Sequence, residues 1–159
     1  MDVALVPVAL ADKAELRAML DPYLIAHADL VDPARVHGDP TEQPHFDLYW
    51  TEPGRIPLWI VADGARAGFL LLNDWSPSGL EVDRAISEFC VAPAFRRTGV
   101  GAAAALAAFA SQAGCWELQV YRANPAGMAF WARVLAAAPT TDRHEITDED
   151  RIIHRFLMP

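Results

Sequence analysis

Cysteine is scarce in this chain of 159 residues, which contains only Cys90 and Cys115. Both lie in apolar runs typical of strands, not in the paired spacings of zinc sites or the dense framework of small secreted domains. We therefore expect two reduced cysteines in the core of a cytoplasmic protein. The five histidines are scattered without the His-x-x-x-His spacing of metal sites, so no bound metal is expected.

Positive charge is also in short supply. Lys and Arg number 13 against 21 Asp and Glu, for a formal net charge of −8 at pH 7. This argues against a nucleic-acid partner, because binding to a phosphate backbone needs a basic surface, and it mildly favours a cationic substrate. Charges such as Asp2, Lys13 and Arg17 interrupt the first thirty residues, and the longest apolar stretch is alanine-rich. Neither a membrane span nor a signal peptide is predicted.

Apolar residues are plentiful, at 53% of the chain. A chain of this length and composition buries roughly 70% of the surface that its unfolded form exposes. The sequence shows no internal repeat and no low-complexity linker. We expect residues 1–159 to form one domain.

The first elements are a strand from Val3 to Leu10 and a helix after it. Asp12 followed three residues later by Glu15 resembles a capping box at the start of that helix. Apolar residues then recur at helical spacing, and Pro22 predicts a kink or a restart.

The middle and end of the chain alternate between strands and helices. Asp63-Gly64 is a strong hairpin signal, and Asn124-Pro125 is typical of a helix start. The expected strands are Leu58–Ala62, Ala67–Leu72, Leu80–Val91, Cys115–Tyr121, Arg143–Thr147 and Arg151–Leu157. The expected helices are Thr98–Ala113 and Pro125–Ala137.

Residues 89–101 are built to hold a phosphate. They end a strand, place two arginines beside Gly99 and Gly101, and open a helix, whose first N–H groups and dipole attract an anion. The P-loop pattern does not occur. Residues 99–104 fit the dinucleotide fingerprint, with Glu117 as its acid, but seven residues separate Val91 from the first glycine and the preceding strands are antiparallel. The sequence around the glycines therefore argues against a dinucleotide site.

A third interpretation rests on two motifs. Arg96-x-x-Gly99-x-Gly101 resembles the Gln/Arg-x-x-Gly-x-Gly/Ala signature of the GNAT superfamily of N-acetyltransferases, and residues 124–131 are similar to its second motif, Asn-x-x-Ala-x-x-Phe-Tyr. The resemblance implies an α/β domain of the α+β type, with a mixed, largely antiparallel sheet of six or seven strands flanked by about four helices. It also implies acetyl-CoA as co-substrate.

Within that family, the resemblance implies that the pyrophosphate lies on the backbone amides around Arg97 to Gly101. The pantetheine arm would pair with the strand backbone near Cys90 and Val91. The full set of implied cofactor contacts is Cys90, Val91, Arg96, Arg97, Thr98, Gly99, Val100, Gly101, Asn124 and Trp131. A purely structural role of the glycines in helix–strand packing is the alternative.

Glu88 is the candidate general base. Strict alternation along the strand places it on one face with Ile86 and Cys90, in a largely apolar row that would raise its pKa. Glutamate near this position is a base in some members of the family. The alternative is a carboxylate that pairs with an arginine or meets solvent.

The chain departs from the family at Trp131, where the usual residue is a tyrosine that protonates the departing thiolate. Indole N–H cannot transfer a proton at ordinary pH. Water can reprotonate the thiolate, or another tyrosine, Tyr49 or Tyr121, can substitute; we name Tyr49 with Glu88 as the catalytic candidates. The rival function is a non-catalytic acyl-CoA-binding or regulatory domain.

The acceptor side is expected in residues 31–56, which are rich in proline and mostly irregular, with a short helix around Thr41 to Trp50. His45 to Trp50 places aromatics and an acid there, which suits the amine of a small, cationic molecule, although aromatic clusters in short helices more often belong to the core. No serine has the context of a nucleophile, so acetyl transfer is expected to be direct. A homodimer has no sequence signature and stays open.

Overall fold

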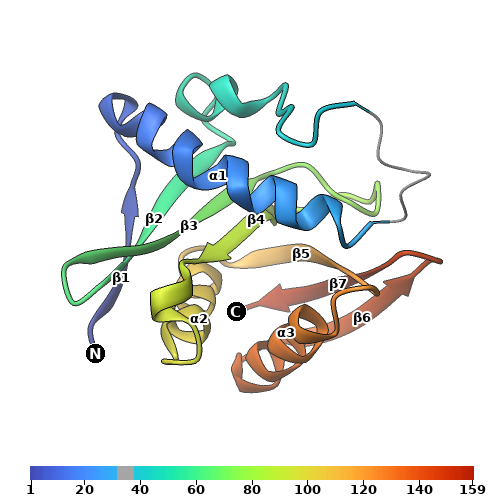
Figure 1. The fold of residues 1–159 in the computed structure, drawn as a ribbon. Coiled ribbons are helices and arrows are strands. Elements are labelled where there is room, and N and C mark those ends of the chain that lie inside the picture. The colour runs from blue at the N-terminus through green and yellow to red at the C-terminus, as the bar shows by residue number, and fades with distance from the viewer. Residues whose placement is uncertain (32–37) are drawn as a thin grey trace.

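A mixed seven-stranded sheet organises the computed structural model, which describes residues 1–31 and 38–159 (Figure 1). The strand order is β1-β2-β3-β4-β5-β7-β6. The strands are β1 (Val3–Pro7), β2 (Ile56–Ala62), β3 (Ala65–Asn73), β4 (Arg84–Val91), β5 (Gly114–Tyr121), β6 (Thr141–Thr147) and β7 (Arg151–Met158). The α-helices are α1 (Lys13–Ala28), α2 (Val100–Ala110) and α3 (Pro125–Ala137), and the 3-10 helices are η1 (Leu10–Asp12), η3 (Phe46–Trp50) and η4 (Pro93–Phe95).

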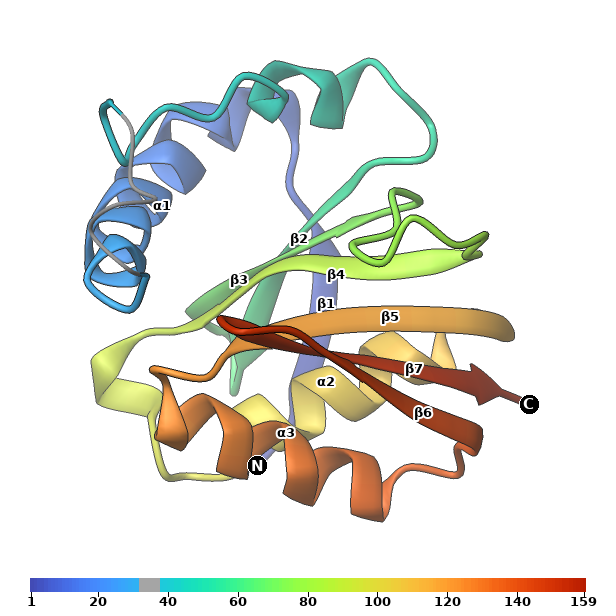
Figure 2. The ribbon, with the colours of Figure 1, turned by 90° about the vertical axis from the view of Figure 1, so that its right-hand side faces the viewer.

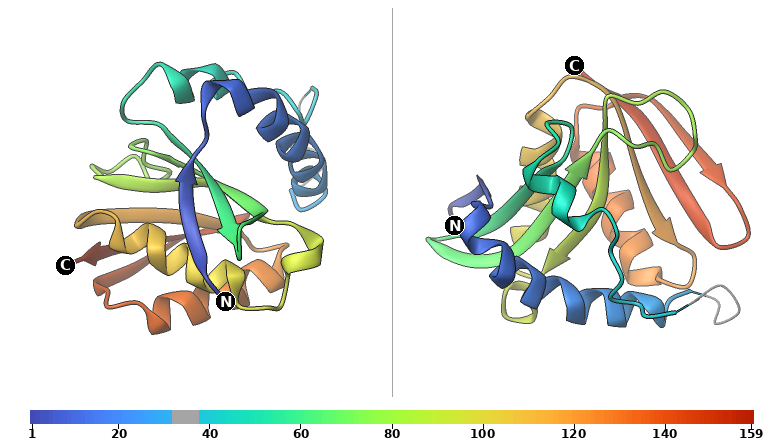
Figure 3. Two further views of the ribbon diagram at one scale, coloured as in Figure 1. Left: turned by 90° about the vertical axis from the view of Figure 1, so that its left-hand side faces the viewer. Right: turned by 90° about the horizontal axis from the view of Figure 1, so that it is seen from above.

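Helices cover both faces of the sheet. Figure 2 shows α1 on one side and α2 with α3 on the other, and the view from above in Figure 3 shows α1 and η3 lying across the same face. The central strand β3 is buried on both faces, because Phe69 and Leu71 pack toward α1 whereas Leu70 and Leu72 pack toward α2 and α3. This explains its continuous apolar sequence.

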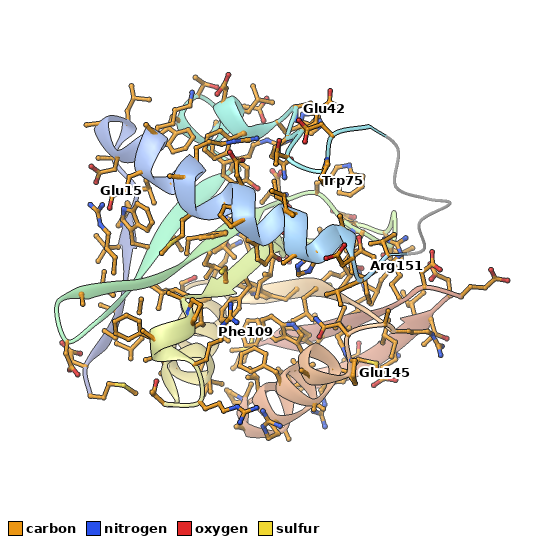
Figure 4. All side chains as sticks on the ribbon, viewed as in Figure 1. Glu15, Glu42, Trp75, Phe109, Glu145 and Arg151 are labelled. Carbon is orange, nitrogen blue, oxygen red and sulfur yellow. The ribbon has the colours of Figure 1, made fainter. Side chains whose placement is uncertain are left out.

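The layer under α2 and α3 holds the larger core. Small side chains on α2, such as Ala104 and Ala108, are fully buried and allow the helix to approach the sheet closely. Phe109 points from α2 into this layer (Figure 4), with its ring centroid 5.4 Å from that of Trp116 and 4.9 Å from that of Phe156.

The strands β4 and β5 form the parallel pair of this largely antiparallel sheet, and they pair over a short length. Their register runs only from Arg84 opposite Trp116 to Ile86 opposite Leu118. Beyond Ile86, β4 stays paired with β3 on its other edge but no longer with β5. The two strands therefore part in the middle of the sheet.

A β-bulge in β4 stands at the point of separation. Leu72 pairs with Ile86 and Leu71 with Glu88, so that Ser87 is an extra residue. The bulge reverses the alternation: Ile86 packs with the α2 and α3 layer, whereas Cys90 packs with the α1 layer, and Glu88 faces Tyr23 of α1. The predicted shared face is therefore right for Glu88 and Cys90 and wrong for Ile86, because strict alternation assumes an unbroken ladder.

The expected fold class is confirmed, with seven strands and the expected strand–helix–strand–helix order that begins with β4. The fourth expected helix, around Thr41 to Trp50, forms as the 3-10 helix η3. Residues 32–37 of the segment expected to be irregular lie outside the described residues. None of the helices in the described ranges has the length and apolarity to cross a membrane.

The capping box predicted at the start of α1 does not form, and of the two alternatives predicted at Pro22, a kink or a restart, the restart does not occur. Asp12 makes no capping hydrogen bond, because its carboxylate instead pairs with Arg66 of β3 at 2.8 Å. The helix does not restart at Pro22 but runs through it from Lys13 to Ala28. Packing of Leu16 and Leu20 against the sheet, with no exposed surface, offsets the backbone hydrogen bond that proline cannot donate.

We expect Gly68→Ala to lower the free energy of unfolding by about 3 kcal/mol or more, because a Cβ there would overlap the carbonyl oxygen of Cys90 on β4. Gly79→Ala is the matched control. It has open space but a φ of +80°, so a loss of about 1–2 kcal/mol is expected. Urea unfolding measures both, and equal losses would show that β3 and β4 are not held this closely.

Candidate active site

The turn between β4 and α2 presents backbone amides without a side chain to cap them. Arg97 and Gly99 both adopt left-handed backbone conformations, with φ of 62° and 92°. Gly99 is the N-cap of α2, and no side chain accepts a hydrogen bond from the first turn. Closely spaced amides of this kind form a concave binding site for an anion. The residues present therefore fit a pyrophosphate at the start of α2.

The two glycines of the motif have different reasons to be glycine. Gly99 needs its positive φ, and a side chain there would meet almost nothing but Met1. A Cβ at Gly101 would lie 3.2 Å from the ring of Phe130 and 3.3 Å from Val91. The packing alternative thus holds for Gly101, whereas Gly99 serves the geometry of the turn.

The side chains of the turn mostly hold its shape. Nε of Arg96 donates to the carbonyl oxygen of Val91 at 2.9 Å. The hydroxyl of Thr98 donates to the carbonyl oxygen of Phe95 at 2.6 Å. Val100 is fully buried, so it offers a ligand only its backbone. Arg97 is exposed and is the arginine best placed to meet an anion directly.

Cys90 and Val91 lie on β4 beyond its last pairing with β5. Their backbone on that edge has no β5 partner, as the predicted contact with an extended ligand arm requires. Burial raises the pKa of the Cys90 thiol, and nearby Arg96 only partly opposes this. The thiol is therefore protonated at neutral pH and is a poor nucleophile.

Glu88 lies on the same strand, where β4 and β5 part. Its carboxylate is half-buried, and the side chains of Tyr23 and Gln43 lie within hydrogen-bonding reach. Burial raises the pKa of Glu88 to about 7, against the smaller opposing effect of those two partners. Among the residues that the structure describes, no arginine contributes to the pKa shift of Glu88, so none of these arginines forms the alternative ion pair.

Sequence patterns did not point to Tyr23, His27 or Gln43. Tyr23 of α1 and Gln43 of the segment before η3 lie within reach of the Glu88 carboxylate, and His27 of α1 contacts Tyr23. The ring of His27 also contacts that of Tyr121 on β5, with centroids 5.9 Å apart. The spacing of Tyr23 and His27, four residues apart on a helix, could have suggested a pair, but only the path of α1 across the sheet brings the pair to Glu88.

Tyr49, the second catalytic candidate, is buried in the layer under α1 with 5% of its surface exposed. Its hydroxyl accepts a hydrogen bond from Asn73 at 3.5 Å and lies within reach of Ser87 at the bulge. Burial raises the pKa of Tyr49, and the charge of Glu88 adds to this. The structure therefore brings Tyr49 to the same part of the sheet as Glu88, with its proton firmly held.

A small cavity of about 100 Å³ opens beside Glu88. Its lining combines the carboxylate with neutral polar groups and one indole, from Asn73, Trp75, Pro77, Ala85, Ile86, Ser87, Glu88 and Gln119. Trp75 is 68% exposed at its rim and is labelled in Figure 4. The cavity can admit the head of a small molecule, and the indole can cover what stays outside.

Asn124 and Trp131 both have structural roles in α3. Asn124 is the N-cap, as expected, and its side-chain oxygen accepts from the amide of Gly127 at 2.9 Å. Trp131 is 7% exposed and packs on Phe89 with centroids 5.1 Å apart. Core filling thus accounts for Trp131, and a contact of either residue with a ligand stays a prediction.

The sequence matches the model of the Acetyltransferase (GNAT) family over residues 23–136. No curated protein matches the chain. Among solved structures, an acetyltransferase from Thermus thermophilus is 16% identical, with a TM-score of 0.68 over 99% of this chain and 98% of that one. Spermidine N-acetyltransferase from Vibrio cholerae, in complex with CoA and spermine, is 11% identical, with a TM-score of 0.64 over 98% and 95%.

A ribosomal-protein alanine N-acetyltransferase from Escherichia coli is likewise similar, at 16% identity and a TM-score of 0.62 over 98% of this chain and 94% of that one. Identities this low establish a shared fold alone. The named acceptors of these two enzymes also differ in kind, one a polyamine and the other a protein.

We expect Glu88→Gln to stabilise the protein more at pH 8 than at pH 5. Because the pKa of Glu88 is raised from 4.5 to about 7 in the folded protein, the unfolded chain loses the carboxyl proton at a lower pH than the folded protein does. The free energy of unfolding of the wild type therefore falls as the pH rises from about 4.5 to 7. The glutamine variant lacks this loss, so the difference in unfolding free energy should grow by up to about 3 kcal/mol. A difference that stays constant with pH would show that burial does not perturb Glu88.

Proposed function

The chain belongs to the GNAT family of acetyltransferases, which use acetyl-CoA, and we propose that it transfers the acetyl group directly onto the amine of a small molecule. The observation that carries this proposal is the placement of Glu88. A carboxylate with a pKa of about 7 lies where β4 and β5 part, three residues before the strand runs into the amide-rich turn. One strand thus joins a base to an anion-binding site.

The backbone from Cys90 to Gly101 would hold acetyl-CoA. The free edge of β4 near Cys90 and Val91 suits the pantetheine arm, and the amides from Arg97 to Gly101, with the Arg97 guanidinium, suit the pyrophosphate. When bound, acetyl-CoA supplies an acetyl group activated as a thioester. The protein's part is to position that group and to manage protons.

Glu88 would act as the general base, directly or through a water. An amine in water is mostly protonated at neutral pH and must lose a proton before it can attack. A base with a pKa near the working pH is ionised often enough to accept that proton and basic enough to remove it. Its half-buried position also keeps bulk water from competing.

The thiolate that leaves needs a proton or a hydrogen bond. Because Trp131 is in the core, its indole cannot take the role of the family's tyrosine, and Tyr49 is the phenol we assign to it. The raised pKa of Tyr49 favours hydrogen-bond donation over full transfer. A thiolate with a pKa of about 8.5 can take its proton from water, and Tyr121 is a further phenol close enough to Glu88 for the charge of Glu88 to raise its pKa.

The acceptor would bind beside Glu88, with its amine in the 100 Å³ cavity and its remainder against Trp75. The small volume favours a small molecule, and the net charge of −8 favours a cationic one. The aromatic cluster expected on the acceptor side is partly core, since Phe46 and Tyr49 are buried. Two free cysteines fit a cytoplasmic location, and a homodimer stays an open prediction.

A second candidate function is a non-catalytic acyl-CoA-binding or regulatory domain, which the absence of a tyrosine at position 131 favours. Release of free thiol from acetyl-CoA, assayed over a panel of small amines, separates the two. We expect at least one amine to give saturable thiol release. Acetyl-CoA binding with no amine-dependent release across the panel would favour the regulatory domain.

With an active amine, kcat/KM should rise with pH through an apparent pKa near 7. Glu88→Gln should lower kcat by about a hundredfold or more and abolish this rise, while leaving acetyl-CoA binding intact. An unchanged rate and pH profile in the variant would remove Glu88 from the mechanism.

We expect Arg97→Gln to raise the Kd for CoA about five- to tenfold at low salt, since it removes one charged partner of the pyrophosphate. The effect should shrink as salt screens the charge. The matched control is Arg133→Gln on α3, another exposed arginine, for which no change is expected. Titration calorimetry measures both, and equal affinities of the two variants would place the pyrophosphate elsewhere.

A further inference from the structure

Helix α1 carries two protic side chains from Glu88 toward the surface. The hydroxyl of Tyr23 lies within hydrogen-bonding reach of the Glu88 carboxylate, and it lies 3.4 Å from Nε2 of His27. The two rings also contact each other, with centroids 4.4 Å apart. Both side chains are half-buried, so the chain of groups begins at the base and ends at a residue that solvent can reach.

The general base needs such an exit. While an amine that has given its proton to Glu88 stays bound on the cleft side of the carboxylate, a path on the side of α1 lets this proton leave and regenerates the base. Of the described side chains within hydrogen-bonding reach of Glu88, Gln43 has an amide that donates but does not relay a proton. The phenol of Tyr23 can both accept and donate.

We propose that Tyr23 and His27 form a relay that returns the proton of the acceptor amine from Glu88 to solvent. The proposal rests on the function proposed above for Glu88. Neither Tyr23 nor His27 touches the acceptor, and both act through Glu88.

The relay consists of three proton transfers, and each group that accepts a proton also releases one. After Glu88 accepts the amine proton, its carboxyl O–H donates to the Tyr23 oxygen, and the Tyr23 O–H passes its own proton to Nε2 of His27. The imidazolium then releases the proton on Nδ1 to water. The His27 tautomer and the Tyr23 hydroxyl return to their starting states when the imidazole exchanges its remaining proton with solvent. No other reactant is consumed.

The surroundings hold each group in the state that the relay needs. Burial lowers the pKa of His27, which keeps Nε2 free to accept a proton at neutral pH. Burial and the charge of Glu88 raise the pKa of Tyr23, so the phenol keeps its proton between turnovers. Within the part of the chain that the structure describes, the other titratable groups near this pair are Cys90 of β4, near Tyr23, and Tyr121 of β5, whose ring contacts His27 edge-on.

The test uses Tyr23→Phe, His27→Ala and His27→Gln in the full chain with an active amine. Tyr23→Phe keeps the ring that packs edge-on against Phe69 at 5.5 Å, so the fold should persist, and thermal unfolding checks this. We expect kcat to fall about tenfold in each variant, with little change in the KM of the amine and a larger solvent deuterium effect. His144→Ala, an exposed histidine on β6, is the matched control and should keep wild-type kcat.

Two readouts separate a relay from a structural role. At pH values well above the pKa of Glu88, loss of Tyr23 as a hydrogen-bond donor to Glu88 would by itself no longer lower kcat. Loss of the relay should still lower kcat at these pH values. Added imidazole should restore kcat to His27→Ala but not to Tyr23→Phe, where the link to Glu88 is missing. A loss of kcat that imidazole does not restore in His27→Ala would overturn the relay.

The proposed function and the relay fail in different ways. If Glu88→Gln retains activity, Glu88 is not the base and both proposals fall. If Glu88→Gln is inactive while Tyr23→Phe and His27→Ala keep wild-type kcat at high pH, the base stands and the relay is wrong.

Discussion

The site depends on the short pairing between β4 and β5. Three residue pairs join the strands, and the extra residue Ser87 then turns β4 so that Glu88 faces α1. A parallel pair that continued along the whole of both strands would fill the middle of the sheet and leave no free backbone near Cys90 and Val91. Because the other edge of β4 stays bonded to β3, the opening costs the sheet little of its hydrogen bonding.

Glu88 and Glu117 lie on neighbouring strands, and their surroundings shift their pKa values in opposite directions. Glu117 of β5 has no exposed surface, and burial alone would raise its pKa, but Ser78, Ser76 and Arg155 donate hydrogen bonds and lower it instead. That cluster ties the loop carrying Trp75 to β5. Among the described residues, Tyr23 and Gln43 interact with Glu88 and lower its pKa, but the effect of burial is larger and the pKa rises to about 7. The Glu117 carboxylate is held charged by its donors, whereas burial favours the protonated form of Glu88.

Much of the architecture follows from local sequence. Asp63-Gly64 sets the turn of a hairpin, and Asn124-Pro125 starts α3. Both effects depend on the backbone of a few neighbouring residues, so they can be predicted without the fold. Glu88 was found because a carboxylate in an apolar strand is unusual wherever the strand lies. Its face was misassigned relative to Ile86 because a bulge depends on the partner strand. The capping role of Asp12 failed for a similar reason, since Arg66 comes from 54 residues away.

Local sequence predicted the amide-rich turn before α2, the order of the elements and Glu88 as the candidate base, because each prediction depends on neighbours along the chain. Only the folded chain shows what surrounds the Glu88 carboxylate. Tyr23 and Gln43 reach Glu88, and His27 reaches Tyr23, only because α1 and the segment before η3 cross the sheet where β4 and β5 part. Long-range packing sets such encounters, and the pKa of Glu88 depends on them, since burial by distant segments raises it.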